Sequence, residues 1–108
     1  MIIEKDGFIH HVYFWLKNPD SADDRAKLIA GLQKLSAAAI IKDFHIGIPA
    51  ETNRGVIDST YAASWLLLFE NKEDQDSYQT DPMHVTFVEE CSQLWNKVVV
   101  YDTVSITP

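Results

Sequence analysis

The sequence predicts an α+β domain in which a four-stranded antiparallel sheet carries its helices on one face. Segments typical of strands and helices follow the order strand, helix, strand, strand, helix, strand, and two such halves build this sheet. The first and third strand segments are apolar on both faces, so the helices alone do not cover them. At 108 residues, of which 46% are hydrophobic, the chain fits one domain over residues 1–108.

The first predicted strand covers residues 8–17, where aromatic and branched side chains dominate. Alternation along a strand places His11, Tyr13 and Trp15 on one face and His10 on the other. A helix should follow the break at residues 18–20, capped by an aspartate or serine there. Its expected buried stripe consists of Leu28, Ile29, Leu32, Leu35 and Ala39.

Three segments are expected between the first main helix and residue 70. Residues 40–48 contain a second strand, which Pro49 ends. Residues 50–60 form a flap, because hairpin loops usually have only ~2–5 residues. Residues 61–69 form an uncharged third strand, with Trp65 and Leu67 on one of its faces.

A short polar helix over residues 70–80 leads to the second main helix, and a last strand covers residues 97–106. The second main helix should begin at Asp81-Pro82, because aspartate accepts free amide hydrogens and proline lacks one. It should end near Trp95-Asn96. Its apolar stripe is headed by a histidine and comprises His84, Phe87, Val88, Cys91, Leu94 and Trp95. We therefore expect His84 to point into the protein, close to Tyr78.

This arrangement is the ferredoxin-like plan, and it leaves one sheet face bare. The bulky apolar side chains on that face predict a partner, of which a second copy in a two-fold dimer is the simplest. Two sheets facing each other would form an α/β barrel with a space for a small apolar or aromatic molecule. The residues expected to line this space are His11, Tyr13, Trp15, Trp65 and Leu67.

Several short motifs, in this order and at these spacings, resemble the stress-responsive α/β-barrel (Dabb) domain family. They are His11-Val12-Tyr13-Phe14-Trp15-Leu16-Lys17, Leu68-Phe69-Glu70, Tyr78-x-x-Asp81-Pro82-x-His84-x-x-Phe87 and Val100-Tyr101-Asp102. The resemblance spans nearly the whole chain and implies a dimeric ferredoxin-like barrel with a pocket between sheet and helices. The chain departs from the family pattern at Asp81, where many relatives have histidine.

The family implies no single activity, although a few plant members are polyketide cyclases that use a tyrosine and a histidine. Tyr78 and His84 match that pair in type and spacing. The resemblance also matches the family's first-strand histidine to His11 and an aspartate near the catalytic imidazole to Asp102.

The chemistry of these residues fits proton abstraction next to a carbonyl. His84 near a helix N-terminus would stay neutral and act as a base, while Asp102 behind the ring would fix its tautomer. Tyr78 would donate a hydrogen bond to the developing oxyanion. This predicts a cofactor-free cyclase or isomerase. The alternative is that His84 and Asp102 only form a structural hydrogen bond with each other under the helix cap.

The composition of the chain argues against several functional classes. A net charge of −7 disfavours nucleic-acid binding, and no apolar run approaches the ~20 residues that span a membrane. A single cysteine excludes an internal disulfide, and with no visible signal segment it indicates a cytoplasmic protein. No metal-ligand spacing is present, so we expect neither a metal nor another cofactor.

Three functions remain open from the sequence. The leading one is a homodimer that binds a small apolar or aromatic molecule. The second is an enzyme that uses Tyr78 and His84. The third is a structural dimer whose barrel is filled by its own side chains.

Overall fold

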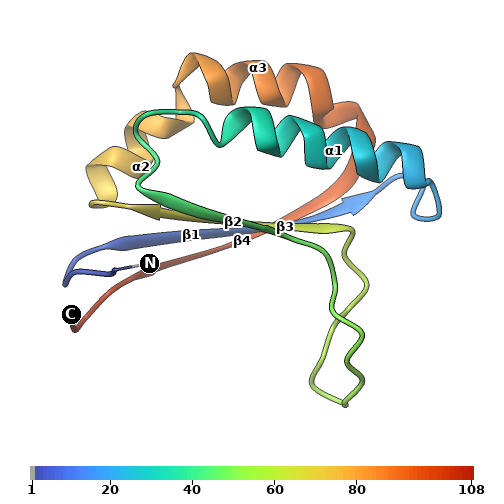
Figure 1. Cartoon of the computed structure of the whole chain (residues 1–108), viewed down its shortest axis with the longest axis horizontal. Helices are drawn as coiled ribbons and strands as arrows, with labels where there is room; N and C mark the ends of the chain where they lie inside the picture. Colours follow the sequence, from blue (N-terminus) through green and yellow to red (C-terminus); the bar gives the residue numbers. More distant parts are fainter. Residues whose placement is uncertain (1) are drawn as a thin grey trace.

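A computed structural model describes residues 2–108 as an antiparallel sheet with three α-helices on one face (Figure 1). The strands are β1 (Phe8–Leu16), β2 (Asp43–Gly47), β3 (Ala63–Phe69) and β4 (Trp95–Val104). The helices are α1 (Ala22–Leu35), α2 (Lys72–Gln79) and α3 (Pro82–Cys91), and the short 3₁₀ turn η1 (Ser92–Leu94) follows α3. The order across the sheet is β2-β3-β1-β4. This is the ferredoxin-like α+β fold that the sequence predicts.

Side-chain caps start both main helices at the predicted positions. The Ser21 hydroxyl accepts from the Asp24 amide at 3.1 Å, and the Asp81 carboxylate accepts from the Met83 amide at 2.8 Å. Pro82 occupies the first turn of α3, where a missing amide hydrogen leaves no bond unmade. The caps therefore fix where α1 and α3 begin.

The predicted end of α3 is wrong by about one turn. The helix ends at Cys91 instead of near Trp95, although the apolar spacing continues through Leu94. The Leu94 carbonyl accepts from the Lys17 amide at 2.9 Å, and Trp95 already pairs with Leu16 of β1. Strand pairing therefore overrides the helical pattern, because β4 starts at Trp95 in order to pair with Leu16, the last residue of β1.

The register of the sheet decides which side chains enter the core. Val12 of β1 lies opposite Trp65 of β3, and His10 lies opposite Leu67, so these four side chains share the helix-covered face. Their neighbours in the core are Phe8, Phe14, Leu16, Leu28, Leu32, Leu35, Ala63, Phe69, Tyr78 and Phe87. The core thus lies between the sheet and the helices.

Within residues 2–108, no helix covers the opposite face of the sheet (Figure 1). It presents Ile9, His11, Tyr13 and Trp15 of β1, with Tyr101 of β4 beside them at 63% exposure. The connection over residues 48–62 extends on this side, away from the helices (Figure 1). We call this connection the flap.

No helix within residues 2–108 combines the length and the apolar character needed to cross a bilayer.

Candidate functional site

The pairing of β1 with β4 brings a histidine and an aspartate together on the helix-covered face. His10 lies opposite Asp102, so both side chains point the same way. The Nδ1 atom of His10 is 2.6 Å from Oδ1 of Asp102, where the imidazole is 8% exposed and the carboxylate 43%. Because an ionised carboxylate only accepts, Nδ1 carries the proton, and in the neutral ring Nε2 keeps its lone pair.

Tyr78, near the C-terminal end of α2, lies beside this pair. Its side chain is almost fully buried, with ring centroids 5.1 Å from Phe69 and 6.2 Å from His10. The Trp65 indole Nε1 donates to the Tyr78 hydroxyl at 3.3 Å, so the phenolic proton is left for a further acceptor. Burial raises the pKa of Tyr78 to about 12, so the phenol is a neutral donor at pH 7.

His84 faces Tyr78 from the first turn of α3, with ring centroids 4.6 Å apart. Its Nδ1 atom is 3.1 Å from the Gln79 carbonyl oxygen. A carbonyl only accepts, so Nδ1 carries the proton and Nε2 keeps its lone pair. Burial lowers the pKa of His84, which keeps the ring neutral and able to accept a proton at pH 7.

These four side chains, His10, Tyr78, His84 and Asp102, form what we call the proton-transfer cluster. They come from β1, α2, α3 and β4, so no short sequence motif contains them all. The cluster combines two imidazoles that can accept a proton with a phenol that can donate one. Such a set is chemically suited to moving a proton between two atoms of a ligand.

The structure corrects one expectation about this cluster. The sequence predicts Asp102 behind His84, whereas its carboxylate binds His10. The difference follows from the β1–β4 register, which places Asp102 opposite His10. Strand alternation already places His10 on the face opposite to His11, and the pairing with Asp102 is what makes His10 a member of this cluster.

A second set of predicted site residues lies on the uncovered face. His11 stacks on Tyr13 with ring centroids 4.4 Å apart, and the Tyr13 hydroxyl lies 3.3 Å from Nδ1 of His11. The rings of Tyr61 and Tyr101 meet Tyr13 edge-on, at 5.0 and 6.2 Å. Burial, with His45 and His10 nearby, lowers the pKa of His11 and keeps it neutral at pH 7.

A hollow of about 350 Å³ opens on this same face. It is lined by Tyr13, Trp15, Asp58, Tyr61, Lys97, Val99 and Tyr101. Trp15 donates from Nε1 to the Thr60 hydroxyl at 2.9 Å, and the Lys97 ammonium sits 4.4 Å from a Trp15 ring centroid. Hydrogen bonds from Thr60 hold the pKa of Asp58 below its usual range, so the hollow carries one charge of each sign among aromatic walls.

Trp65 and Leu67 do not line this hollow, which corrects a further expectation. Both are buried in the core on the helix-covered face, because they pair with Val12 and His10 rather than with the odd-numbered residues of β1. The ligand-lining set predicted from the sequence is therefore divided between two faces. Trp65 instead reaches the proton-transfer cluster through its bond to Tyr78.

Within residues 2–108, no three side chains of histidine, cysteine, aspartate or glutamate gather in a way that would hold a metal ion.

Comparison with known proteins identifies the family. The model of the Stress responsive A/B Barrel Domain, Dabb, matches residues 8–105. A Dabb family protein with a ferredoxin-like fold from Mesorhizobium loti is 22% identical with a TM-score of 0.73, and the alignment covers 91% of this chain and 95% of that one. No curated protein is similar enough to this sequence to count as a relative.

Two further solved structures share the fold. A dimeric ferredoxin-like protein of unknown function from Thermobifida fusca is 17% identical, with a TM-score of 0.75 and coverage of 96% and 95% of the two chains. A hydroxynitrile lyase from Passiflora edulis is 20% identical, with a TM-score of 0.73 and coverage of 92% and 93%. Since the family match runs from the first residue of β1 past the end of β4, the chain belongs to the stress-responsive A/B barrel domain (Dabb) family.

Proposed function

We propose that this protein is a homodimer in which two uncovered sheet faces enclose a chamber for a small aromatic or apolar molecule. The observation that supports it is the uncovered face, where Tyr13, Trp15 and Tyr101 surround a hollow of about 350 Å³. A continuous aromatic surface of this kind marks an interface or ligand site on a soluble protein. Fold neighbours from Thermobifida fusca and Bacteroides fragilis are described as dimeric.

The dimensions of the hollow agree with such a role. Small-molecule sites measure roughly 300–1,000 Å³, and the hollow on one copy already reaches the lower end of that range. We place the dimer in the cytoplasm, where the single buried thiol, Cys91, would stay reduced.

The dimer is tested by placing a charge on the uncovered face. Tyr101→Glu buries a carboxylate in the proposed interface, so sedimentation equilibrium should show a dissociation constant raised at least about tenfold. Val85→Glu is the control, because Val85 lies on α3 and is also exposed. A native protein that sediments as a monomer at tens of micromolar would contradict the proposal.

Ligand binding is tested with 1-naphthol, an uncharged two-ring phenol, followed by tryptophan fluorescence. We expect saturable quenching that is lost in Trp15→Ala and retained in Trp95→Phe, since Trp95 packs in the core against Phe14 and Phe87. A dimer that binds no aromatic probe, and whose partner side chains fill the hollow, would support the structural alternative instead.

The second candidate function is a cofactor-free enzyme that transfers a proton at the proton-transfer cluster. The specific observation in its favour is the Trp65 bond to Tyr78, which leaves the phenolic proton to donate to a ligand oxygen. His84 would take a proton from the carbon next to a carbonyl and return it to another atom of the same ligand, while the Asp102 carboxylate holds the neighbouring His10 ring in place. One fold neighbour is named as a hydroxynitrile lyase, so this fold accommodates catalysis.

The enzyme is tested by screening aromatic ketones, polyketide mimics and hydroxynitriles for turnover. His84→Gln removes the base and should lower kcat by about a hundredfold or more, because a positioned base contributes roughly 10²–10⁴. His11→Gln is the matched control, since His11 lies on the opposite face. Unchanged turnover in His84→Gln would remove the catalytic role.

A further inference from the structure

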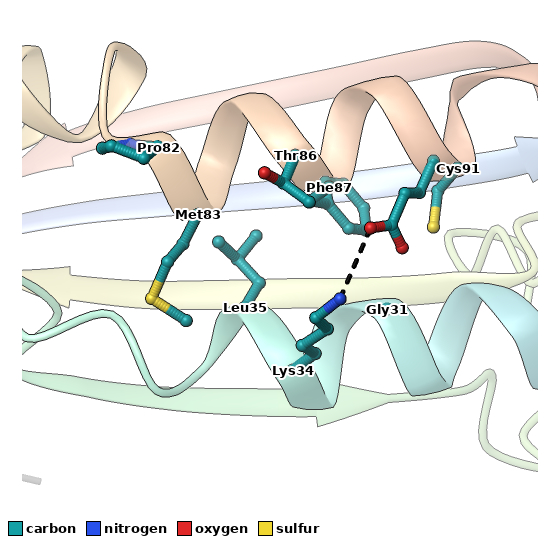
Figure 2. A pocket seen from close by; sticks show the side chains of 9 residues that line it. Gly31, Lys34, Leu35, Pro82, Met83, Thr86, Phe87 and Cys91 are labelled. Carbon is teal, nitrogen blue, oxygen red and sulfur yellow. Dashed lines mark hydrogen bonds and ion pairs between the residues drawn. The ribbon is translucent and has the colours of Figure 1, made fainter.

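Helices α1 and α3 run antiparallel and meet closely where the second half of α1 faces the C-terminal half of α3 (Figure 1). The contact is at Gly31, where an added Cβ would lie 2.6 Å from the Cys91 sulfur and 3.3 Å from the Phe87 ring. Toward the N-terminus of α3 the gap holds a cavity of about 190 Å³ (Figure 2). Its lining residues are Gly31, Lys34, Leu35, Pro82, Met83, Thr86, Phe87, Glu90 and Cys91.

A second hollow continues the same groove toward the C-terminus of α3. It measures about 330 Å³ and shares Gly31, Lys34, Glu90 and Cys91 with the first. The remaining lining residues are Lys27, Ala30, Gln93 and Leu94. The two hollows therefore adjoin along one groove, and the 3.4 Å Lys34–Glu90 ion pair links the two helices at residues that line both hollows (Figure 2).

The two ends of this groove differ in chemistry. The side chains of Met83 and Leu35 point toward each other across the first hollow, with the Phe87 ring beside them, so this end is apolar (Figure 2). The lining of the second hollow includes two lysines, Lys27 and Lys34. Lys34 is paired with Glu90, whereas Lys27 has no ion-pair partner within residues 2–108.

We infer that this groove binds a small carboxylic acid with an apolar chain, such as a medium-chain fatty acid. The apolar chain would lie between Met83, Leu35 and Phe87, and the carboxylate would meet Lys27 at the other end. The volume is sufficient, because an apolar cavity of about 150 Å³ in another protein holds benzene. A chain with net charge −7 repels anions, so binding depends on this local cation.

The site lies in the helical layer, so it is separate from the proposed chamber on the uncovered face and does not require a dimer. Octanoate is a suitable probe, and the ¹³C-labelled methyl group of Met83 reports on the apolar end. We expect a saturable Met83 methyl shift below about 10 mM octanoate, and weaker binding of 1-octanol, which lacks the charge.

Two variants test the two ends. Lys27→Glu should weaken octanoate about fivefold, because a single exposed charge pair contributes on that scale. Lys72→Glu is the control, since it makes the same charge change on α2, where Lys72 pairs with Asp76. Thr86→Phe fills the cavity and should abolish the Met83 shift, with urea unfolding to show that the variant folds.

Any one of several results would overturn the inference. They are a Met83 shift that never saturates, a Thr86→Phe variant that binds octanoate as tightly as the native protein, or equal affinities in Lys27→Glu and Lys72→Glu. Binding that perturbs Tyr13 and Trp15 instead of Met83 would assign the acid to the chamber and would also contradict the groove site.

Discussion

At the scale of single residues, the buried imidazole of His10 is held by the Asp102 carboxylate at 2.6 Å. Asp102→Ala removes this acceptor and leaves a buried Nδ1–H unpaired, so the free energy of unfolding should fall by about 1–3 kcal/mol. Asp102→Asn keeps an acceptor oxygen, so its free energy of unfolding should fall by less than that of Asp102→Ala. Urea unfolding measures both changes.

The matched control for this prediction is Asp76→Ala. Asp76 pairs with Lys72 in an exposed (i, i+4) ion pair on α2, so its loss should cost only about 0.3–0.5 kcal/mol. Equal costs for Asp102→Ala and Asp76→Ala would show that the His10–Asp102 bond does not stabilise the fold.

The buried phenol of Tyr78 makes the protein sensitive to high pH. Its pKa is raised to about 12 in the folded state, against an ordinary value near 10, so between these values the unfolded state loses a proton that the folded state keeps. Stability is therefore full below about pH 10 and falls by up to about 1.4 kcal/mol per pH unit above it. In urea unfolding measured between pH 9 and pH 12, Tyr78→Phe should lose stability less steeply with pH than the native protein. The same dependence on pH in both proteins would show that the burial of Tyr78 does not cause the loss.

Residue identities predicted part of the cluster but not its pairing. Tyr78 and His84 are six positions apart across a helix start, so local geometry alone indicates that they meet, and their rings are 4.6 Å apart. His10 and Asp102 are 92 positions apart, and their contact depends on the register of two strands. A slip of one residue would turn either side chain to the opposite face, and no hairpin turn joins β1 to β4 to fix their register locally.

At the scale of elements, the close contact of α1 with α3 depends on Gly31. Gly31→Ala gains helix propensity of up to about 1 kcal/mol, yet its Cβ would meet the Cys91 sulfur at 2.6 Å. Overpacking of this kind costs about 1–3 kcal/mol, so we expect net destabilisation in urea unfolding.

Removing the sulfur provides the control for this contact. Adding Cys91→Ala to Gly31→Ala relieves the overlap, so the double variant should be more stable than the sum of the two single changes predicts. Additive effects would show that the helices separate freely at this point.

Element types were easier to predict than their ends. The caps Ser21 and Asp81 act within four residues of their own chain, so the starts of α1 and α3 were predicted correctly. The end of α3 was not, because the bond from Lys17 to Leu94 and the pairing of Leu16 with Trp95 come from β1, far away in sequence.

At the scale of the whole molecule, the proposed dimer should weaken in acid. His11 lies on the uncovered face with Tyr13, Tyr101 and His45, and burial lowers its pKa below 6.5. A partner would bury it further, so the dimer favours the neutral ring. The dimer stability that depends on His11 is therefore complete at pH 7 and is lost as pH falls below the lowered pKa that His11 has in the monomer. Sedimentation at pH 7 and pH 5 should show more monomer at pH 5.

His11→Gln is the variant that tests this linkage. Glutamine keeps a polar side chain without a titrating group, so the difference between pH 7 and pH 5 should shrink. His84→Gln is the comparison, because His84 lies on the helix-covered face and its titration should affect folding stability rather than the dimer. An unchanged pH difference in His11→Gln would assign the acid effect to other groups.

The sequence by itself determined the order of elements, the helix caps, the fold class and an aromatic face that no helix covers, because these depend on periodicity and on contacts between near neighbours. The tertiary structure decided which side chains of different strands share a face. The register placed Trp65 and Leu67 in the core and joined His10 to Asp102, whereas alternation along β1 alone already grouped His11 with Tyr13. No short turn joins β1 to β3 or to β4, so their registers depend on the packing of segments that are far apart in the sequence.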